Sequence, residues 1–221
     1  MVAHLKIDFV SDVSCPWCVI GLRALETAVA SLGADIHTEI HFQPFELNPQ
    51  MAPGGQDLDE HLLQKYGATR DQFAATREAI RARGEALGFT FDMQRRGRIY
   101  NTFDCHRLLH WAQAQGRQQA LKHALFSAYF TAGENPSAHD VLLRVAGEVG
   151  LDTTRAAEIL ASDEYAAEVR AIERRYTEAG IHAVPAIIIN DQVVIEGGQP
   201  TEVFVQALRQ VAQRMDPTRA I

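Results

Sequence analysis

The sequence predicts an α/β protein in which a long helical segment interrupts a smaller unit that contains a sheet. Strand-like patterns occur only near the two ends of the chain, whereas residues 57 to about 180 have almost continuous helical periodicity. The predicted order is strand, helix, strand, a helical block, then helix, strand, strand, helix. A chain of 221 residues buries roughly 70% of its unfolded surface, so its core needs no disulfide staples.

The first 44 residues predict a strand–helix–strand unit. Residues 5–9 alternate between apolar and polar side chains, which indicates a strand. A helical pattern then begins at Cys15 or Pro16, where a proline suits the first helical turn, and ends near Gly33. Residues 36–42 form a second strand with one apolar face. We expect the two strands to be parallel, because the connection between them is a right-handed crossover by default.

The middle of the chain predicts a series of helices. Thr69 and Gln72 have capping-box spacing and begin a segment that ends at Gly88. Asn101 caps another helix, which Gly116 closes. Further helices are expected over residues 118–131, 137–149, 152–161 and 163–179.

The last part of the chain changes to a β pattern. Residues 186–189 and 193–195 are short β-branched runs separated by a polar turn, which predicts a hairpin. A final helix begins near Pro200. Removing the helical block leaves a complete thioredoxin topology. We therefore expect a discontinuous thioredoxin-like domain, residues 1–50 and 163–221, and a helical insertion domain, residues 51–162.

Composition and charge exclude several classes of partner. The formal net charge of −7 leaves no basic footprint for nucleic acid or an anionic membrane. The N-terminal residues lack the features of a secretory signal, and no apolar run approaches the roughly 20 residues that span a bilayer. These observations predict a cytoplasmic protein with no nucleic-acid or membrane partner.

The pair Cys15 and Cys18 is the strongest chemical signal in the sequence. Disulfide exchange requires a thiolate, and a helix N-terminus stabilises an anion at the position predicted for Cys15. Cys18 lies one helical turn later, where it can attack a mixed disulfide formed at Cys15. Pro16 and Trp17 between them shape the rim of the site. The pattern predicts redox chemistry without a bound metal or organic cofactor, because the cysteine pair carries the electrons.

The pair has three other interpretations. The first is that two unrelated buried cysteines fall three residues apart by chance. Half of a zinc site needs two more ligands, and the sequence has no second cysteine pair or local histidine pair. A degenerate module that only binds a partner has no need to retain both sulfurs.

Val184-Pro185 lies just before the third predicted strand and is the second feature of the site. In a thioredoxin topology this loop faces the helix that carries the two cysteines. A trans proline is ordinary at the first residue of a strand. We instead predict a cis bond that turns the backbone of Val184 toward the thiols, where it pairs with an extended substrate.

Taken together, these motifs resemble the DsbA family of thiol–disulfide oxidoreductases, and most closely its FrnE-like branch. The resemblance spans nearly the whole chain, and its supporting stretches are residues 11–18, 45–49, 101–104, 106–108, 184–185 and 197–200. It implies that Cys15 is the nucleophile, Cys18 the resolving cysteine and Pro185 the cis-proline. The related 2-hydroxychromene-2-carboxylate isomerases and kappa-class glutathione transferases typically have a single Ser or Cys that activates glutathione, so Cys18 favours disulfide chemistry.

Weaker candidates flank this site. Cys105 falls at helical spacing with Leu109 and Ala112, which predicts a buried apolar thiol. Glu46 is a candidate for proton transfer to Cys18. Four polar residues open one predicted helix, and two interpretations of them are equally good. They either cap the helix and form solvated surface, or they line the active-site cleft. These residues are Asn101, Asp104, His106 and Arg107.

The sequence therefore predicts a DsbA-like protein disulfide oxidoreductase. Its expected partners are protein or small-molecule disulfides and thiols, with glutathione as a possible co-substrate. One alternative is a glutathione-dependent isomerase or transferase of the kappa or 2-hydroxychromene-2-carboxylate type. A second is a chaperone-like binding module without enzymatic activity.

Overall fold

A four-stranded mixed sheet forms the centre of the computed structural model, which describes residues 2–52, 54–67, 69 and 71–215. The strand order is β2 (Ile36–Pro44), β1 (Ala3–Ser11), β5 (Ala186–Ile189) and β6 (Val193–Glu196). β1 is parallel to β2 and antiparallel to β5, and β5 is antiparallel to β6. This arrangement confirms the predicted thioredoxin topology, including the parallel first pair and the C-terminal hairpin.

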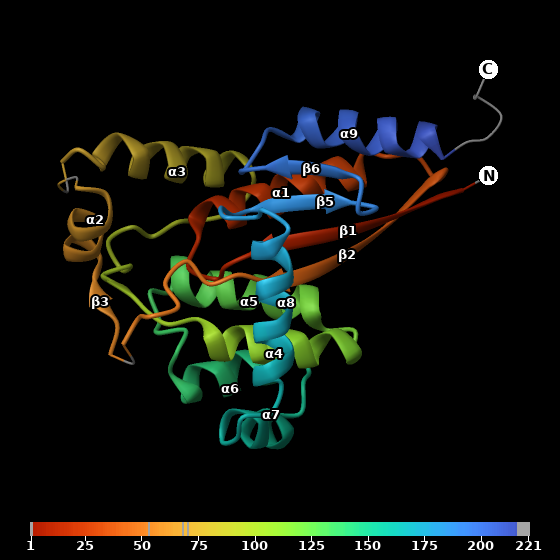
Figure 1. Ribbon diagram of the computed structural model, residues 1–221. Coiled ribbons are helices and arrows are strands. Elements are labelled where there is room, and N and C mark those ends of the chain that lie inside the picture. Colours follow the sequence, from red (N-terminus) through yellow and green to blue (C-terminus); the bar gives the residue numbers. More distant parts are fainter. Residues whose placement is uncertain (1, 53, 68, 70, 216–221) are drawn as a thin grey trace.

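Helices cover both faces of the sheet (Figure 1). α1 (Pro16–Ala30) and α9 (Thr201–Arg214) pack together on one face, and α3 (Ala74–Ala86) lies against α1. The other face is covered by α4 (Phe103–Ala114), α5 (Gln118–Phe126) and α8 (Ala166–Glu178), all of which contact β2. The remaining helices lie outside these two layers and are α2 (Leu58–Tyr66), α6 (His139–Glu148) and α7 (Thr153–Leu160).

The hydrophobic core is continuous between the sheet and the helical block. Phe9 and Phe42 of the sheet pack in one buried cluster with Phe126 and Phe130. The side-chain amide of Gln118 also accepts the backbone N–H of Phe42 at 2.9 Å and donates to its carbonyl at 3.0 Å. An amide of α5 thus satisfies backbone groups of the edge strand β2. The division of the chain into residues 1–50 with 163–221 and residues 51–162 stays a prediction.

The structure also differs from the predicted elements. The capping box is present, because the N–H of Thr69 donates to Gln72 Oε1 at 2.6 Å, but the regular helix begins only at Ala74. The helix expected over residues 118–131 ends at Phe126 and continues as the π-helical turn η1 (Ser127–Thr131). A small antiparallel pair, β3 (Gln56–Asp57) and β4 (Arg98–Ile99), was not predicted from the sequence. Two-residue strands are too short to produce a periodic pattern.

We predict that Gly84→Ala destabilises the protein. A Cβ at this position would overlap the ring of Phe91 and lie 2.9 Å from the carbonyl oxygen of Phe89. The overlap outweighs the better helix propensity of alanine, so the free energy of unfolding should fall by about 1–2 kcal/mol in urea titrations. Gly97→Ala is the control, because its Cβ would enter open space. Equal stability of the two variants would contradict this packing analysis.

Candidate active site

Cys15 lies where the chain passes from β1 into α1. It is the N-cap of the helix, and Pro16 occupies the first helical position. The N–H of Cys15 donates to the carbonyl of Asp12 at 3.3 Å, and the N–H of Cys18 donates to the carbonyl of Cys15 at 3.1 Å. The turn therefore places one sulfur at the helix N-terminus and the other one turn inside.

The two thiols differ in their surroundings. Both are free, and Cys15 is 3% exposed while Cys18 is completely buried. The Cys15 thiol lines a cavity and donates to the carbonyl of Val184 at 3.6 Å. Burial raises the pKa of Cys18 well above its usual range, and the hydrogen bond with Cys15 raises it further. Cys18 therefore retains its proton at neutral pH.

The loop before β5 faces the thiols as predicted, and the Val184–Pro185 bond is cis. Val184 lines the cavity together with Pro16 and Trp17. Pro185 does not line that cavity but is buried behind it against α1, where a Cβ on Gly21 would lie 3.1 Å from its Cγ. The absence of a side chain at Gly21 allows this close contact.

The cavity has a volume of about 630 Å³ and opens beside Cys15. Its walls come from the start of α1, residues 45–48, helices α2 and α3, the segment from 93 to 99, and the loop over 182–184. Apolar side chains form much of the lining and include Trp17, Phe45, Leu62, Tyr66, Phe73, Ile80, Met93 and Ile99. The sequence analysis did not predict the contribution of α2 and α3, because they reach Cys15 only through the fold.

Asp12 is a fully buried carboxylate directly beneath the Cys15 turn. It accepts hydrogen bonds from the N–H of Ser14 at 3.1 Å, from the Ser14 hydroxyl at 3.0 Å and from the N–H of Leu47 at 2.7 Å. His106 Nε2 of α4 lies 3.7 Å from its Oδ1. Burial alone would raise the pKa of Asp12, but His106 and the two N–H groups outweigh burial and lower the pKa to about 2. Asp12 is therefore ionised, and it joins three separate segments.

Lys122 of α5 is a second buried charge that the sequence analysis missed. It is 0% exposed and faces Cys18, Asp12 and Cys105, and its ammonium lies 5.0 Å from the centre of the Phe126 ring. Burial lowers the pKa of Lys122. One feature of the sequence could have predicted its burial: Lys122 lies four residues before Phe126, on an apolar face of the helix. Cys105 is confirmed as a buried thiol, and it donates to the carbonyl of Pro136 at 3.0 Å.

The remaining polar candidates divide into two groups. Asn101 accepts the N–H of Phe103 at 2.9 Å and donates to the buried Glu46 at 3.4 Å, and His106 lies 3.7 Å from Asp12. Both contact acids near the cavity, but neither lines it. Arg107 pairs with Asp104 at 2.8 Å and also bonds backbone carbonyls of the 159–164 segment, which is a structural role.

Glu46 lines the cavity and forms an ion pair with Arg170 of α8. Burial, followed by the charge of Glu173, raises the pKa of Glu46. Its engagement with Arg170 and Asn101 limits its freedom to act alone in proton transfer.

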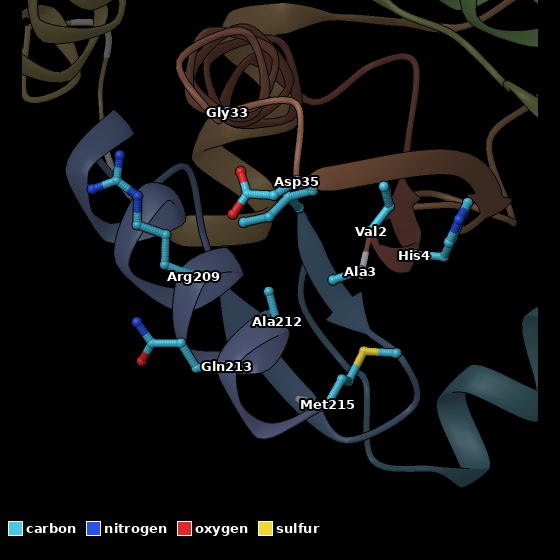
Figure 2. A pocket seen from close by; sticks show the side chains of 10 residues that line it. Val2, Ala3, His4, Gly33, Asp35, Arg209, Ala212, Gln213 and Met215 are labelled. Atoms are coloured by element: carbon cyan, nitrogen blue, oxygen red, sulfur yellow. The ribbon is translucent and has the colours of Figure 1, made fainter. Parts of the chain in front are cut away.

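A second cavity, of about 700 Å³, lies at the opposite end of α1 (Figure 2). Gly33 and Asp35 line it after the end of α1, and Arg209 and Gln213 line it from α9. A helix of this length separates it from Cys15 by roughly 22 Å, and no thiol lines it. It is therefore separate from the cysteine site.

The described residues contain no group of three or more His, Cys, Asp and Glu side chains arranged to hold a metal ion. No helix within them combines the length and the apolar character needed to cross a bilayer.

Comparison with known proteins gives one family. A family model described as a DSBA-like thioredoxin domain matches residues 6–209. The chain is 29% identical over 209 residues to the uncharacterized protein YwbO of Bacillus subtilis, a match that covers 94% of this chain and 96% of YwbO. The crystal structure of the probable DsbA oxidoreductase SCO1869 from Streptomyces coelicolor has a TM-score of 0.89 and 32% identity, covering 99% of this chain and 94% of that one.

Two more distant structures share the fold. A 2-hydroxychromene-2-carboxylate isomerase has a TM-score of 0.68 at 13% identity, covering 95% of this chain and 97% of its own. The cytosolic disulfide reductase DsbM from Pseudomonas aeruginosa, solved with glutathione, has a TM-score of 0.64 at 16% identity, covering 93% and 98%. DsbA proteins and this isomerase class are both relatives that the sequence resemblance named.

Alkylation should distinguish the three thiols. At neutral pH we expect iodoacetamide to modify Cys15 at least tenfold faster than Cys18 or Cys105, because only Cys15 lines the cavity and burial raises the pKa of the other two. Peptide mass spectrometry of samples quenched over time measures each rate. Denatured protein is the control and should show similar rates at all three positions. Equal rates in the folded protein would refute the predicted asymmetry.

The buried charge of Asp12 should appear in the pH dependence of stability. The folded pKa of about 2 lies below the reference value of 3.8, so the carboxylate stabilises the fold above about pH 4, by roughly 2 kcal/mol. This contribution is lost as the pH falls through the folded pKa. Asp12→Asn should therefore be less stable at neutral pH and lose less stability than the wild type between about pH 5 and pH 2.5. Urea titrations at each pH give the free energy of unfolding. If this free energy changed with pH in the same way for the wild type and Asp12→Asn, this role of Asp12 would be wrong.

Proposed function

The chain belongs to the family of DSBA-like thioredoxin domains, and on that premise we propose that it is a thiol–disulfide oxidoreductase that forms a mixed disulfide at Cys15 and resolves it with Cys18. The observation that carries the proposal is the asymmetry of the pair. Cys15 lies at the N-terminus of α1 and lines a cavity, whereas Cys18 is buried one turn later. An attacking sulfur at the wall of a cavity and a resolving sulfur enclosed by protein are what two-step exchange requires.

In the first step the Cys15 thiolate attacks one sulfur of a substrate disulfide. A bond forms between Cys15 Sγ and that sulfur as the substrate S–S bond breaks, and the other sulfur leaves as a thiolate. The attacking sulfur belongs to the N-cap residue of α1. In this state the Val184 carbonyl no longer accepts the Cys15 thiol and is available to an N–H of the substrate. Pro16 and Trp17 line the space where that substrate binds.

In the second step Cys18 loses its proton and attacks Cys15 Sγ. The mixed disulfide breaks, the second substrate sulfur leaves as a thiolate, and a Cys15–Cys18 disulfide remains. The high pKa of Cys18 opposes this step, while the buried ammonium of Lys122 favours the thiolate of Cys18. The pair has then given two electrons to the substrate, and no bound metal or organic cofactor is required.

A thiol partner closes the cycle. Two glutathione molecules, or one partner dithiol, reduce the Cys15–Cys18 disulfide and are themselves oxidised by two electrons. The DsbM structure solved with glutathione supports a thiol of this kind, and its description as cytosolic supports a cytoplasmic location for this chain. Protein or small-molecule disulfides are the proposed substrates.

A glutathione-dependent isomerase is the second candidate function. The fold shared with the 2-hydroxychromene-2-carboxylate isomerase and the size of the cavity favour it. Such a reaction needs one thiol-binding position and makes no use of a second cysteine. Acid-quenched alkylation in buffers of defined glutathione potential tests the difference, because only the oxidoreductase needs a reversible Cys15–Cys18 disulfide.

Substitution of each cysteine gives distinct expected results. Cys15→Ser should reduce the turnover of insulin or of glutathione disulfide to the background rate, because no attacking sulfur remains. Cys18→Ala should complete the first step and accumulate a mixed disulfide, which mass spectrometry of acid-quenched samples detects. Cys105→Ala is the matched control and should retain normal turnover. Normal turnover by Cys18→Ala would overturn the two-cysteine mechanism and favour chemistry at a single thiol.

A further inference from the structure

The cavity beside Cys15 carries positive charge in a protein whose formal net charge is −7. Three permanent cations line it, Lys65, Arg77 and Arg96, together with His61 and His182. Arg77 is neutralised by an ion pair with Asp59. The carboxylate in the lining, Glu46, is already paired with Arg170. The local charge of the cavity is therefore opposite to that of the whole chain.

Lys65 and Arg96 are the two cations of this wall whose hydrogen bonds go to neutral oxygens. The charge of the buried Asp12 reaches Lys65 and partly offsets the burial that lowers the pKa of Lys65. Lys65 Nζ donates to the carbonyl of Leu47 at 2.9 Å and to Asn48 Oδ1 at 2.8 Å, and Arg96 Nη2 donates to the carbonyl of Ser14 at 3.1 Å. All three acceptors are neutral oxygens, and neither cation forms an ion pair with a carboxylate in the described residues. The nearby acid Asp12 is buried and directed to Ser14, Leu47 and His106.

Arg96 lies close to the reacting sulfur. Its hydrogen bond reaches the carbonyl of Ser14, the residue that precedes Cys15. Its guanidinium is held against two aromatic rings. Arg96 Cζ lies 5.1 Å from the centre of the Tyr129 ring and 4.9 Å from the centre of the Phe130 ring. Its Nε is buried and has no hydrogen-bond partner among the described residues. The guanidinium is therefore held in place against the backbone that precedes the nucleophile, and because Arg96 also lines the cavity its charge is suited to an anionic ligand there.

The rest of the cavity determines the chemical character of the molecule to which the anionic group is attached. Apolar and aromatic side chains line most of the remaining space, and the volume of about 630 Å³ is that of a small-molecule site. We propose that the site selects small thiols and disulfides that combine an anionic group with an apolar body, with Arg96 and Lys65 binding the anion while Cys15 reacts with the sulfur. This inference rests on the proposed function and names the substrate class of the same site.

Two aromatic disulfides test the inference. Both rings of 5,5′-dithiobis(2-nitrobenzoate) carry a carboxylate, whereas 4,4′-dithiodipyridine has none. In each case the Cys15 thiolate attacks one sulfur, forms a mixed disulfide and releases one aromatic thiolate that absorbs light. The second-order rate constants are measured in a Cys18→Ala background, and the ratio of anionic to neutral reagent is compared between variants. The ratio removes any change in the intrinsic reactivity of Cys15.

We expect Lys65→Gln and Arg96→Gln each to lower this ratio severalfold, and the double variant to lower it roughly tenfold or more. Arg96→Lys keeps the charge and should restore part of the loss. Arg209→Gln is the control, because it removes the same charge from the exposed α9 surface beside the second cavity (Figure 2). Lys65 is exposed, so its variant provides a test even if substitution of Arg96 prevents folding.

The possible outcomes separate the two proposals. An unchanged ratio in the Lys65 and Arg96 variants, or an equal fall in Arg209→Gln, overturns the anion site and leaves the proposed function standing. If neither reagent reacts with Cys15, as judged against Cys15→Ser, the proposed function fails as well.

Discussion

The buried carboxylate of Asp12 is the constraint on which the arrangement of the active site depends. Its two oxygens accept hydrogen bonds from the backbone N–H and hydroxyl of Ser14 and from the N–H of Leu47, and the ring of His106 lies 3.7 Å away. These partners belong to the Cys15 turn, to the segment after β2 and to α4. A buried charge is costly unless such groups compensate it. The Cys15 turn, one cavity wall and the helical block are therefore held together at one point.

The difference between the two thiols follows from how α1 is buried. The helix begins at the surface of the cavity and packs between the sheet and α3, so one turn separates a sulfur that lines the cavity from one that is completely enclosed by protein. Burial keeps Cys18 protonated, and the neighbouring Lys122 of α5 acts on the pKa of Cys18 in the opposite direction. The helical block therefore contributes to the surroundings of Cys18 as well as to the walls of the cavity.

The cavity is built from segments that are distant in the sequence. Its sulfur comes from α1, whereas Lys65 and Arg96 come from α2 and from the segment before β4. Arg96 is fixed by the rings of Tyr129 and Phe130 and reaches back to Ser14. Substitutions in α2 or near residue 96 can therefore change the lining of the cavity without altering the cysteine pair.

Local pattern in the sequence was sufficient for the fold class and for the cysteine pair. Strand alternation, the position of Pro16 and the order of Cys15, Cys18 and Pro185 are properties of short segments and of their succession along the chain. The capping box at Thr69 and the buried thiol of Cys105 were predictable for the same reason.

Only the tertiary structure decided the surroundings of the thiols. Asp12 meets His106 across 94 positions of the chain, and Lys122 faces Cys18 across 104. Neither pair leaves a periodic or spaced signal, because contact between distant residues depends on how helices pack on the sheet. A lysine or an arginine in a sequence is most simply a solvated surface charge. Lys122 becomes buried only when the packed elements exclude water from it. Arg96 lacks an ion pair within the described residues only because the packed elements place no carboxylate beside it.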